Sequence, residues 1–163
     1  MTSVQADIAI DRIPASFGAW EELLTIIRKS FAHMDGIIDP PSSVHRLTSE
    51  TLRAKARSEI GFLAQAGDAI VGCAFIAEKA DHFYVGKLAV LPPHQGHGVG
   101  RRLLSAAEQH AIAAGKPLLE LQTRVELTGN HRAFHALGFV ETGRTAHQGY
   151  DRPTSVTMRK RLA

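Results

Sequence analysis

Cysteine and long apolar runs are both scarce in this sequence of 163 residues. The single cysteine, Cys73, excludes a disulfide within the chain and fits a reducing compartment. No apolar run is long enough to cross a membrane, and residues 1–11 do not have the basic and then apolar pattern of a signal peptide. These absences predict a cytoplasmic protein without a membrane partner.

A strong excess of charge of one sign is also missing. The formal net charge is +3 without the nine histidines, and charged residues make up 21% of the chain. Such mild and scattered basicity suits a phosphate-bearing small ligand and does not favour nucleic acid as a partner. The length and an apolar fraction of 44% predict one globular domain over residues 1–163, which would bury about two-thirds of its unfolded surface.

The spacing of apolar residues predicts a mixed order of strands and helices. Apolar residues recur every three or four positions from Trp20 to Phe31 and from Val99 to Ala111, which indicates helices with one apolar face. Between the first two predicted helices, residues 35–43 form a constrained loop with Gly36, Pro40 and Pro41. We predict strands at 4–10, 62–65, 69–78, 83–90, 118–123, 140–144 and 155–161, and helices at 14–34, 49–58, 131–137 and from 99 to a stop at Gly115.

A glycine-rich segment precedes the helix that begins near residue 99. Its three glycines stand at alternate positions, so that backbone N–H groups are not shielded by side chains, and the positive end of the helix points at the same place. Amides and a helix N-terminus that converge in this way form a cradle for a phosphate or a pyrophosphate. Arg101 and Arg102 would add positive charge at its rim. The segment is Gln95-Gly96-His97-Gly98-Val99-Gly100-Arg101.

Two common phosphate-binding motifs do not fit this segment. A P-loop would need Gly-Lys-Ser/Thr after the glycines, and a dinucleotide fingerprint would need a glycine where Arg101 or Leu103 stands. Glu120 lies about where a ribose-binding acid would be sought, so a nucleotide-cofactor enzyme stays open as an alternative. A turn without a ligand is the other alternative, and the strand, loop and basic helix start together disfavour it.

The residues from Gln95 to Gly100 match the Gln/Arg-x-x-Gly-x-Gly/Ala signature of the GNAT superfamily of N-acetyltransferases. The resemblance extends back through residues 86–92, forward to residues 130–139 with their Leu-Gly-Phe ending, and to residues 157–160. It implies an α+β fold with a mixed, mostly antiparallel sheet of about seven strands and about four helices. It also implies acetyl-coenzyme A (acetyl-CoA) as the acetyl donor and a primary amine as the acceptor, and it says nothing of the acceptor's identity.

In the GNAT fold, the strand before the glycine loop separates from its neighbour and binds the pantetheine arm. The resemblance thus implies that backbone groups of Leu88, Ala89 and Val90 pair with this arm, and that the N–H of Leu88 or Val90 faces the thioester oxygen. It further implies that the amides from Gln95 to Arg101 hold the pyrophosphate. Asn130 would reach the same substrate or else cap the short helix. Phe134 would contact acetyl-CoA as well.

Acetyl transfer needs a neutral amine, although an alkylamine with a pKa of about 10.4 is almost fully protonated at pH 7. Tyr84 stands where some histone-acetylating relatives carry a glutamate base. Tyr84 or His82 would organise a water relay for the proton, or Tyr84 packs as an ordinary aromatic residue. Glu120 is the nearby carboxylate, either as the base or as a hydrogen-bonded structural acid.

Phe134 is a second departure, because many GNAT members carry a tyrosine there that protonates the leaving thiolate. Tyr150 and His147, in the loop between the last two strands, either substitute for this tyrosine or are plain loop residues. The departures at Phe134 and Tyr84 motivate an alternative function, a silent acetyl-CoA-binding sensor or interaction module.

Our interpretation is an N-acetyltransferase that acts by direct attack in a ternary complex, with a small-molecule amine as the acceptor. Asp35, Asp39 and Glu50 flank the loop that admits the acceptor in relatives, and their carboxylates either attract a cationic amine or form an ordinary solvated loop surface. No metal is predicted, because His131 and His135 have no third ligand. The sequence leaves open whether the chain forms a homodimer.

Overall fold

A computed structural model describes residues 7–162 and shows one sheet of seven strands in the order β1-β2-β3-β4-β5-β7-β6. Among these strands, only β4 and β5 pair in parallel, and every other pair is antiparallel. The predicted mixed sheet is therefore confirmed. The strands are β1 (Ile8–Arg12), β2 (Ile60–Ala66), β3 (Ala69–Glu78), β4 (His82–Val90), β5 (Leu118–Arg124), β6 (Val140–Thr145) and β7 (Ser155–Arg161).

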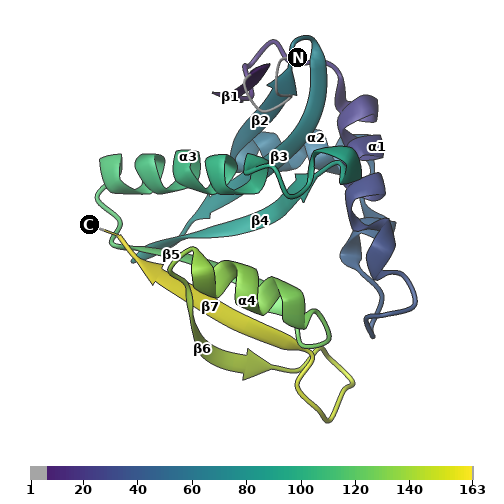
Figure 1. Cartoon of the computed structure of the whole chain (residues 1–163), viewed down its shortest axis with the longest axis vertical. Helices are drawn as coiled ribbons and strands as arrows, with labels where there is room; N and C mark the ends of the chain where they lie inside the picture. The colour runs from purple at the N-terminus through teal and green to yellow at the C-terminus, as the bar shows by residue number, and fades with distance from the viewer. Residues whose placement is uncertain (1–6, 163) are drawn as a thin grey trace.

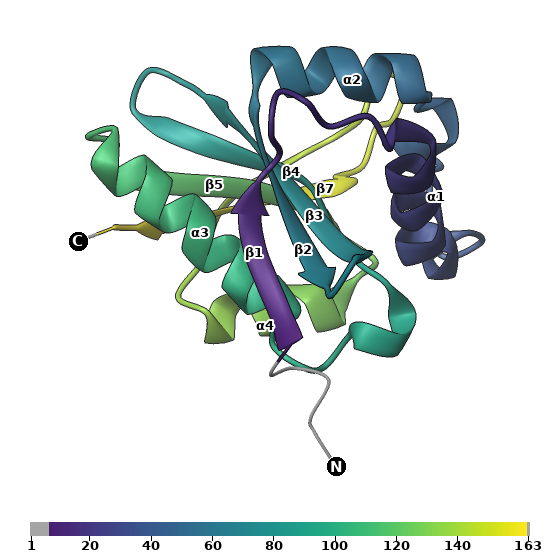
Figure 2. The same ribbon diagram turned by 90° about the horizontal axis from the view of Figure 1, so that it is seen from above.

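The described part of the chain has four α-helices, as expected, and three short 3₁₀ helices. Helices α3 and α4 lie on one face of the sheet, and α1 and α2 lie on the other (Figures 1 and 2). None of the helices within residues 7–162 is long and apolar enough to cross a membrane. The helices are α1 (Trp20–Phe31), α2 (Ser49–Ser58), α3 (Val99–Ala113) and α4 (Thr128–Ala136), with 3₁₀ turns η2 (Ala32–Met34), η3 (Ser43–Arg46) and η4 (Pro92–His94).

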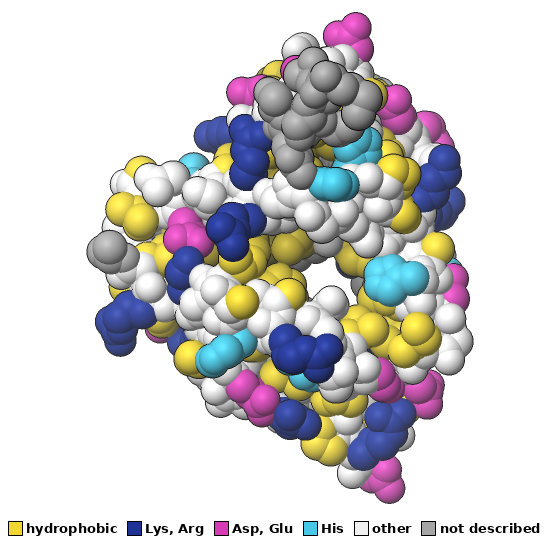
Figure 3. All heavy atoms as spheres, in the orientation of Figure 1, with side chains coloured by type: hydrophobic (Ala, Val, Ile, Leu, Met, Phe, Trp, Pro, Cys, Tyr) yellow, Lys and Arg dark blue, Asp and Glu magenta, His cyan; other side chains and the backbone are white. Residues whose placement is uncertain are grey.

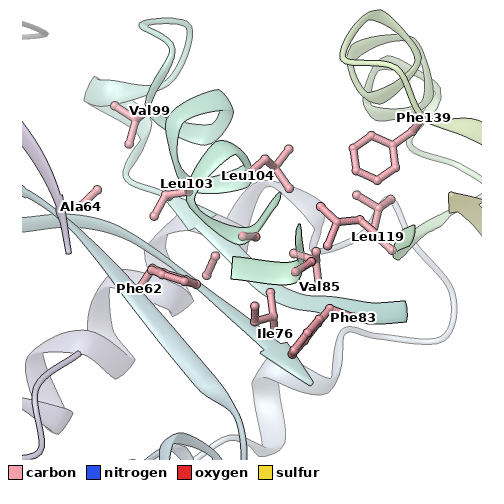
Figure 4. Close-up of a cluster of buried hydrophobic side chains, with 14 of the residues drawn as sticks. Phe62, Ala64, Ile76, Phe83, Val85, Val99, Leu103, Leu104, Leu119 and Phe139 are labelled. Carbon is pink, nitrogen blue, oxygen red and sulfur yellow. The ribbon is translucent and has the colours of Figure 1, made fainter. Parts of the chain in front are cut away.

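Two apolar cores form because the strands at the centre of the sheet bury side chains on both faces. In β3, Ala74 and Ile76 face α3, while Cys73 and Phe75 face α1 and α2. The larger cluster joins β2, β4, β5 and α3 (Figure 4). A strand buried on both faces has a nearly continuous apolar sequence, as residues 70–76 do.

Several predicted element boundaries were wrong, and three of them concern the first strand and the starts of two helices. Residues 4–6 of the first predicted strand lie outside the described residues, and β1 continues to Arg12. The first helix begins at Trp20, not at Pro14, because residues 14–17 form a turn closed by a hydrogen bond from the Phe17 N–H to the Pro14 carbonyl. The helix α4 begins at Thr128 rather than at 131, and Asn130 is therefore inside it and not at its N-cap.

Candidate functional site

The parallel strands β4 and β5 separate halfway along β4. Their pairing runs from His82 opposite Leu118 to Val85 opposite Leu121, whereas the pairing of β4 with β3 continues to Val90. In Figure 1 the two halves of the sheet therefore diverge from a common end. Among the described strands, none pairs with the β5 side of residues 86–90, so that backbone groups there are available to a ligand.

A bulge accompanies this separation. The β3–β4 register shifts between Cys73 and Phe75, and Lys87 at the shift has a φ of +51°. An extra residue in one strand leaves its backbone groups outside the regular ladder. The bulge contains both Lys87 and Leu88, and the N–H of Leu88 was predicted to face the reacting carbonyl.

The glycine segment adopts the backbone that an anion cradle requires. Gly96 and Gly98 have φ values of +78° and +82°, and nothing lies within 4 Å of where their Cβ atoms would stand. Helix α3 begins at Val99, and its first hydrogen bond runs from the Arg102 N–H to the Gly98 carbonyl at 3.0 Å. The N–H groups of residues 99–101 consequently have no acceptor within the helix.

Two residues near the cradle have roles that differ from the predicted ones. The Gln95 side chain donates to the Val90 carbonyl at 2.8 Å, and its own N–H donates to the Pro92 carbonyl at 3.2 Å. Gln95 thus ties the loop to the end of β4, and its amide is already engaged. Arg102 donates to the Ile8 carbonyl at 2.7 Å and therefore holds β1 rather than the rim of the cradle.

Two cavities meet between the separated strands. The first, of about 460 Å³, is lined by the end of β4, the glycine segment and one side of α4. The second, of about 560 Å³, is lined by β4, β5, the loop after η2 and the loop between β6 and β7. Figure 3 shows an opening at this place with hydrophobic side chains around it. Five residues line both cavities: Phe31, Met34, Leu88, Asn130 and Phe134.

Residues predicted to bind acetyl-CoA and residues predicted to take part in catalysis both border these cavities. Leu88, Ala89, Val90, Gln95, Gly96, Gly98, Val99, Gly100 and Arg101 line the first cavity. Tyr84 lines the second, and burial together with the charges of Glu120 and Glu59 raises the pKa of its phenol. Tyr84 is therefore protonated at neutral pH.

Glu120 lies beside Tyr84 in the sheet but is held by other side chains. It is opposite Tyr84 in the β4–β5 pairing, and the Arg159 Nε donates to its carboxylate at 2.8 Å. The His82 Nε2 is 3.7 Å from its other oxygen, and the His82 Nδ1 lies 2.7 Å from the exposed carboxylate of Asp81. Glu120 is not among the residues that line either cavity.

The two residues from α4 stand where the cavities join. The Asn130 amide donates to the Thr123 hydroxyl at 3.4 Å, which orients it toward β5. Phe134 packs edge-on against the buried Phe139, with 6.0 Å between the ring centres. Its ring has no proton to give, so Phe134 forms an apolar wall at the junction.

The predicted substitutes for the missing tyrosine both line the second cavity. The Tyr150 hydroxyl donates to the Asp39 carboxylate at 2.7 Å, and this bond raises the pKa of the phenol. The His147 ring bonds to the Thr154 hydroxyl, while burial and the nearby Arg124 lower the pKa of the imidazole.

The carboxylates that were expected to attract a cationic amine do not line the second cavity. Asp35 is bound to His45 at 2.7 Å, Asp39 is bound to Tyr150 and Arg152, and Glu50 is exposed on α2. Four cations that no sequence motif indicates line it instead, namely Arg46, Lys55, Lys87 and Arg124. Lys87 lies inside the segment that carried the resemblance, but nothing in the local sequence signals its left-handed backbone.

The sequence model of the acetyltransferase (GNAT) family matches residues 20–139. The chain belongs to this family. It is accordingly an acyltransferase, and the nucleotide-cofactor alternative is set aside. Among the described residues of this GNAT protein, no group of three or more His, Cys, Asp or Glu side chains is arranged to hold a metal ion.

Relatives with assigned activities include an IAA acetyltransferase of Azospirillum brasilense. It is 35% identical over 130 residues, which are 78% of this GNAT chain and 82% of the relative. An aminoalkylphosphonate N-acetyltransferase of Salmonella typhimurium is 36% identical over a shorter stretch of 58 residues, 36% of this chain and 38% of that one.

Solved structures confirm the GNAT fold. A family acetyltransferase from Elizabethkingia anophelis with acetyl-CoA bound superposes with a TM-score of 0.68 at 18% identity, over 96% of this chain and 99% of that one. One from Staphylococcus aureus MU50 gives a TM-score of 0.75 at 17% identity with the same coverage.

Proposed function

We propose that this chain transfers the acetyl group of acetyl-CoA to a primary amine of a small molecule, by direct attack in a ternary complex. One observation carries the proposal: a cavity with an anion cradle and a second cavity meet at Leu88. A donor and an acceptor that enter from opposite sides would bring thioester and amine together at that junction. The described unit of sheet and helices supplies both halves of the site.

The residues of the first cavity fit acetyl-CoA. The amides of residues 96–101 would hold the pyrophosphate, and the positive end of α3 together with Arg101 would favour its charge. The backbone of Leu88, Ala89 and Val90 would pair with the pantetheine arm. When bound, acetyl-CoA supplies the thioester whose carbonyl carbon the amine attacks. Asn130 and Phe134 would contact the arm from α4.

The N–H of Leu88 would act as the oxyanion donor. It lies in the bulge with Lys87, which takes it out of the regular ladder, and it would donate to the carbonyl oxygen as negative charge develops there. Losing such a donor costs about 3–4 kcal/mol of barrier in other enzymes. The thiolate needs no strong acid, because a thiol with a pKa of about 8.5 leaves readily near neutral pH.

The amine proton would leave along a polar path from the cavity to the surface. Tyr84 borders the cavity, Glu120 is its neighbour on β5, and His82 connects Glu120 to the exposed Asp81. In this path the Tyr84 hydroxyl accepts the proton as it gives its own to a water or to Glu120. Glu120 is the base at the end of the relay, and Arg159 orients it.

Steady-state kinetics with acetyl-CoA and a panel of primary amines test the proposal. Thiol release and the mass of the N-acetylated product should rise together, and double-reciprocal plots should intersect, as a ternary complex requires. Parallel lines would indicate an acetylated enzyme and contradict direct attack. Binding of acetyl-CoA without turnover of any amine would favour the silent sensor.

A further inference from the structure

The charges around the second cavity are unbalanced in a way that an ordinary amine site does not require. Four cationic side chains line it, and within residues 7–162 no aspartate or glutamate does. A primary amine approaches as a cation at neutral pH, since its pKa is about 10.4. A cavity with only positive groups would repel such a molecule unless the molecule also carries negative charge.

The four cations are not equivalent. Arg124 is engaged, because its guanidinium donates to the Pro40 and Pro41 carbonyls at 2.6 and 3.2 Å. Lys55 forms an ion pair with Glu59 at 2.8 Å. These two have partners of their own and contribute to the shape of the cavity.

Lys87 and Arg46 have no carboxylate partner among the described residues. The Lys87 ammonium donates to the Ser43 hydroxyl at 2.9 Å, and Arg46 is exposed at the end of η3. Burial and the charges of Lys55 and Arg46 lower the pKa of the Lys87 ammonium, which the charge of Glu59 opposes. Two cations thus act on the Lys87 ammonium here against one carboxylate.

Lys87 also stands next to the reacting centre. It precedes Leu88, the proposed oxyanion donor, and the bulge directs its side chain toward η3 rather than along the regular strand. A group bound by Lys87 would therefore lie in the acceptor cavity, a short distance from the thioester.

We propose that the acceptor carries an anionic group, a carboxylate or a phosphoryl group, beside its primary amine, and that Lys87 and Arg46 bind this group. The inference rests on the proposed transfer to an amine and specifies the class of the acceptor. Ser43, at the start of η3, adds a hydroxyl beside the Lys87 ammonium. Charge-assisted hydrogen bonds of this kind are about twice as strong as neutral ones.

Matched pairs of amines test the proposal. β-Alanine is compared with β-alaninamide, and O-phosphoethanolamine with ethanolamine, so that each pair differs in the anionic group and the two pairs separate carboxylate from phosphoryl. 6-Aminohexanoate and its amide extend the spacer. We expect kcat/KM for the member that carries the anionic group to exceed that of the partner without it by about 10- to 100-fold in at least one pair.

Two variants assign the effect to the named side chains. Lys87→Met keeps the unbranched apolar stem and removes the ammonium, and Arg46→Met removes an exposed charge that has no hydrogen-bond or ion-pair partner among the described residues. Each should raise KM for the amine with an anionic group about tenfold or more, should not raise KM for its partner without that group, and should leave acetyl-CoA affinity unchanged. Lys29→Met and Arg53→Met, at exposed positions of α1 and α2 outside the cavity, are the controls.

The outcomes separate the two proposals. Equal kcat/KM within every pair, or an equal loss for both members in Lys87→Met, overturns the anionic acceptor and leaves the transfer standing. When no amine reacts, calorimetry with O-phosphoethanolamine and ethanolamine on CoA-saturated protein decides whether the anion site exists. Binding of the phosphorylated amine alone supports the anion site while the transfer fails, and equal or absent binding of both sinks the anion site as well.

Discussion

At the start of α3, Gly98 combines a left-handed backbone with an open surface. Its φ is +82°, and no atom lies within 4 Å of the position where a Cβ would stand. A Cβ would thus meet no neighbouring atom, although the left-handed backbone strains any side chain there, so the effect on the ligand is read against an uncharged variant of the same shape. Gly98→Asp should weaken acetyl-CoA binding strongly, since a carboxylate about 4 Å from a phosphate is repelled by about 1–4 kcal/mol.

Gly98→Asn is the matched control for this change. Asparagine has the same shape, tolerates the left-handed region as well as aspartate does, and carries no charge. Calorimetric titration with acetyl-CoA should give a dissociation constant for the Asn variant between those of the wild type and the Asp variant. Equal affinities of the Asp and Asn variants would show that the pyrophosphate does not lie at this place.

A substitution of Tyr84 tests the proposed proton path most directly. Tyr84→Phe keeps the ring and removes the hydroxyl, and we expect kcat at pH 7 to fall about tenfold or more, with KM for acetyl-CoA unchanged. Because the neutral fraction of the amine grows as pH rises toward about 10, the defect should shrink with increasing pH. A pH–rate profile from 6.5 to 9.5 measures this, and a defect independent of pH would exclude the relay.

Single residues differ in how far the sequence reveals them. Gly96 and Gly98 have the exposed backbone that the sequence predicts, because the conformation of a glycine-rich helix start is local, and their role as a phosphate cradle stays a prediction. The ion pair of Glu120 with Arg159 joins residues 39 positions apart, and the bond of Tyr150 to Asp39 joins residues 111 apart. Such pairs depend on strand register, which the local pattern does not contain.

On the scale of elements, the loop at residues 35–43 lines the second cavity, the proposed acceptor site. Arg124 at the end of β5 donates to two of its carbonyls, and Tyr150 and Arg152 bind Asp39 in it. Arg124→Met should release the loop. We expect a loss of about 1–3 kcal/mol in the free energy of unfolding and a several-fold lower kcat/KM for the acceptor, with acetyl-CoA affinity unchanged.

Urea denaturation and steady-state kinetics measure both effects of Arg124→Met. Arg161→Met, an exposed position in β7, controls for the loss of one positive charge. The same loss of stability in both variants, or a change in acetyl-CoA affinity as large as that for the acceptor, would argue against a loop held by Arg124.

Element type was predictable here and element ends were less so. Helix α1 was found from its apolar spacing, but its predicted start at Pro14 was wrong, since proline also favours the turn that the chain adopts there. The predicted start of α4 at 131 was wrong because Leu127, at its N-cap, has no capping side chain to mark the boundary. The bulge at Lys87 arises from the pairing of β4 with β3, which becomes visible only in the sheet.

At the scale of the whole molecule, two cores on opposite faces of one sheet hold the separated strands in place. Cys73 is fully buried in the core between β3, α1 and α2, behind the bulge, and its thiol donates weakly to the Lys87 carbonyl at 3.5 Å. Burial raises the pKa of the Cys73 thiol to about 12, and the charge of Lys87 opposes this shift.

This shift predicts how the stability of the whole fold depends on alkaline pH. A cysteine in the unfolded chain loses its proton near pH 8.5, so above that pH the unfolded state binds fewer protons than the folded state. The contribution of Cys73 is therefore fully present below about pH 8.5 and declines, by about 1.4 kcal/mol per pH unit, as pH rises toward about 12.

Urea denaturation between pH 7 and 10.5 measures this decline in the free energy of unfolding. Cys73→Ala should be less stable than the wild type at pH 7, because a buried side chain is lost, and the two stabilities should converge as pH rises. Tyr84 and Lys87 titrate in both proteins, so the difference isolates the thiol, and parallel curves would mean that Cys73 ionises in the folded protein as readily as in the unfolded chain.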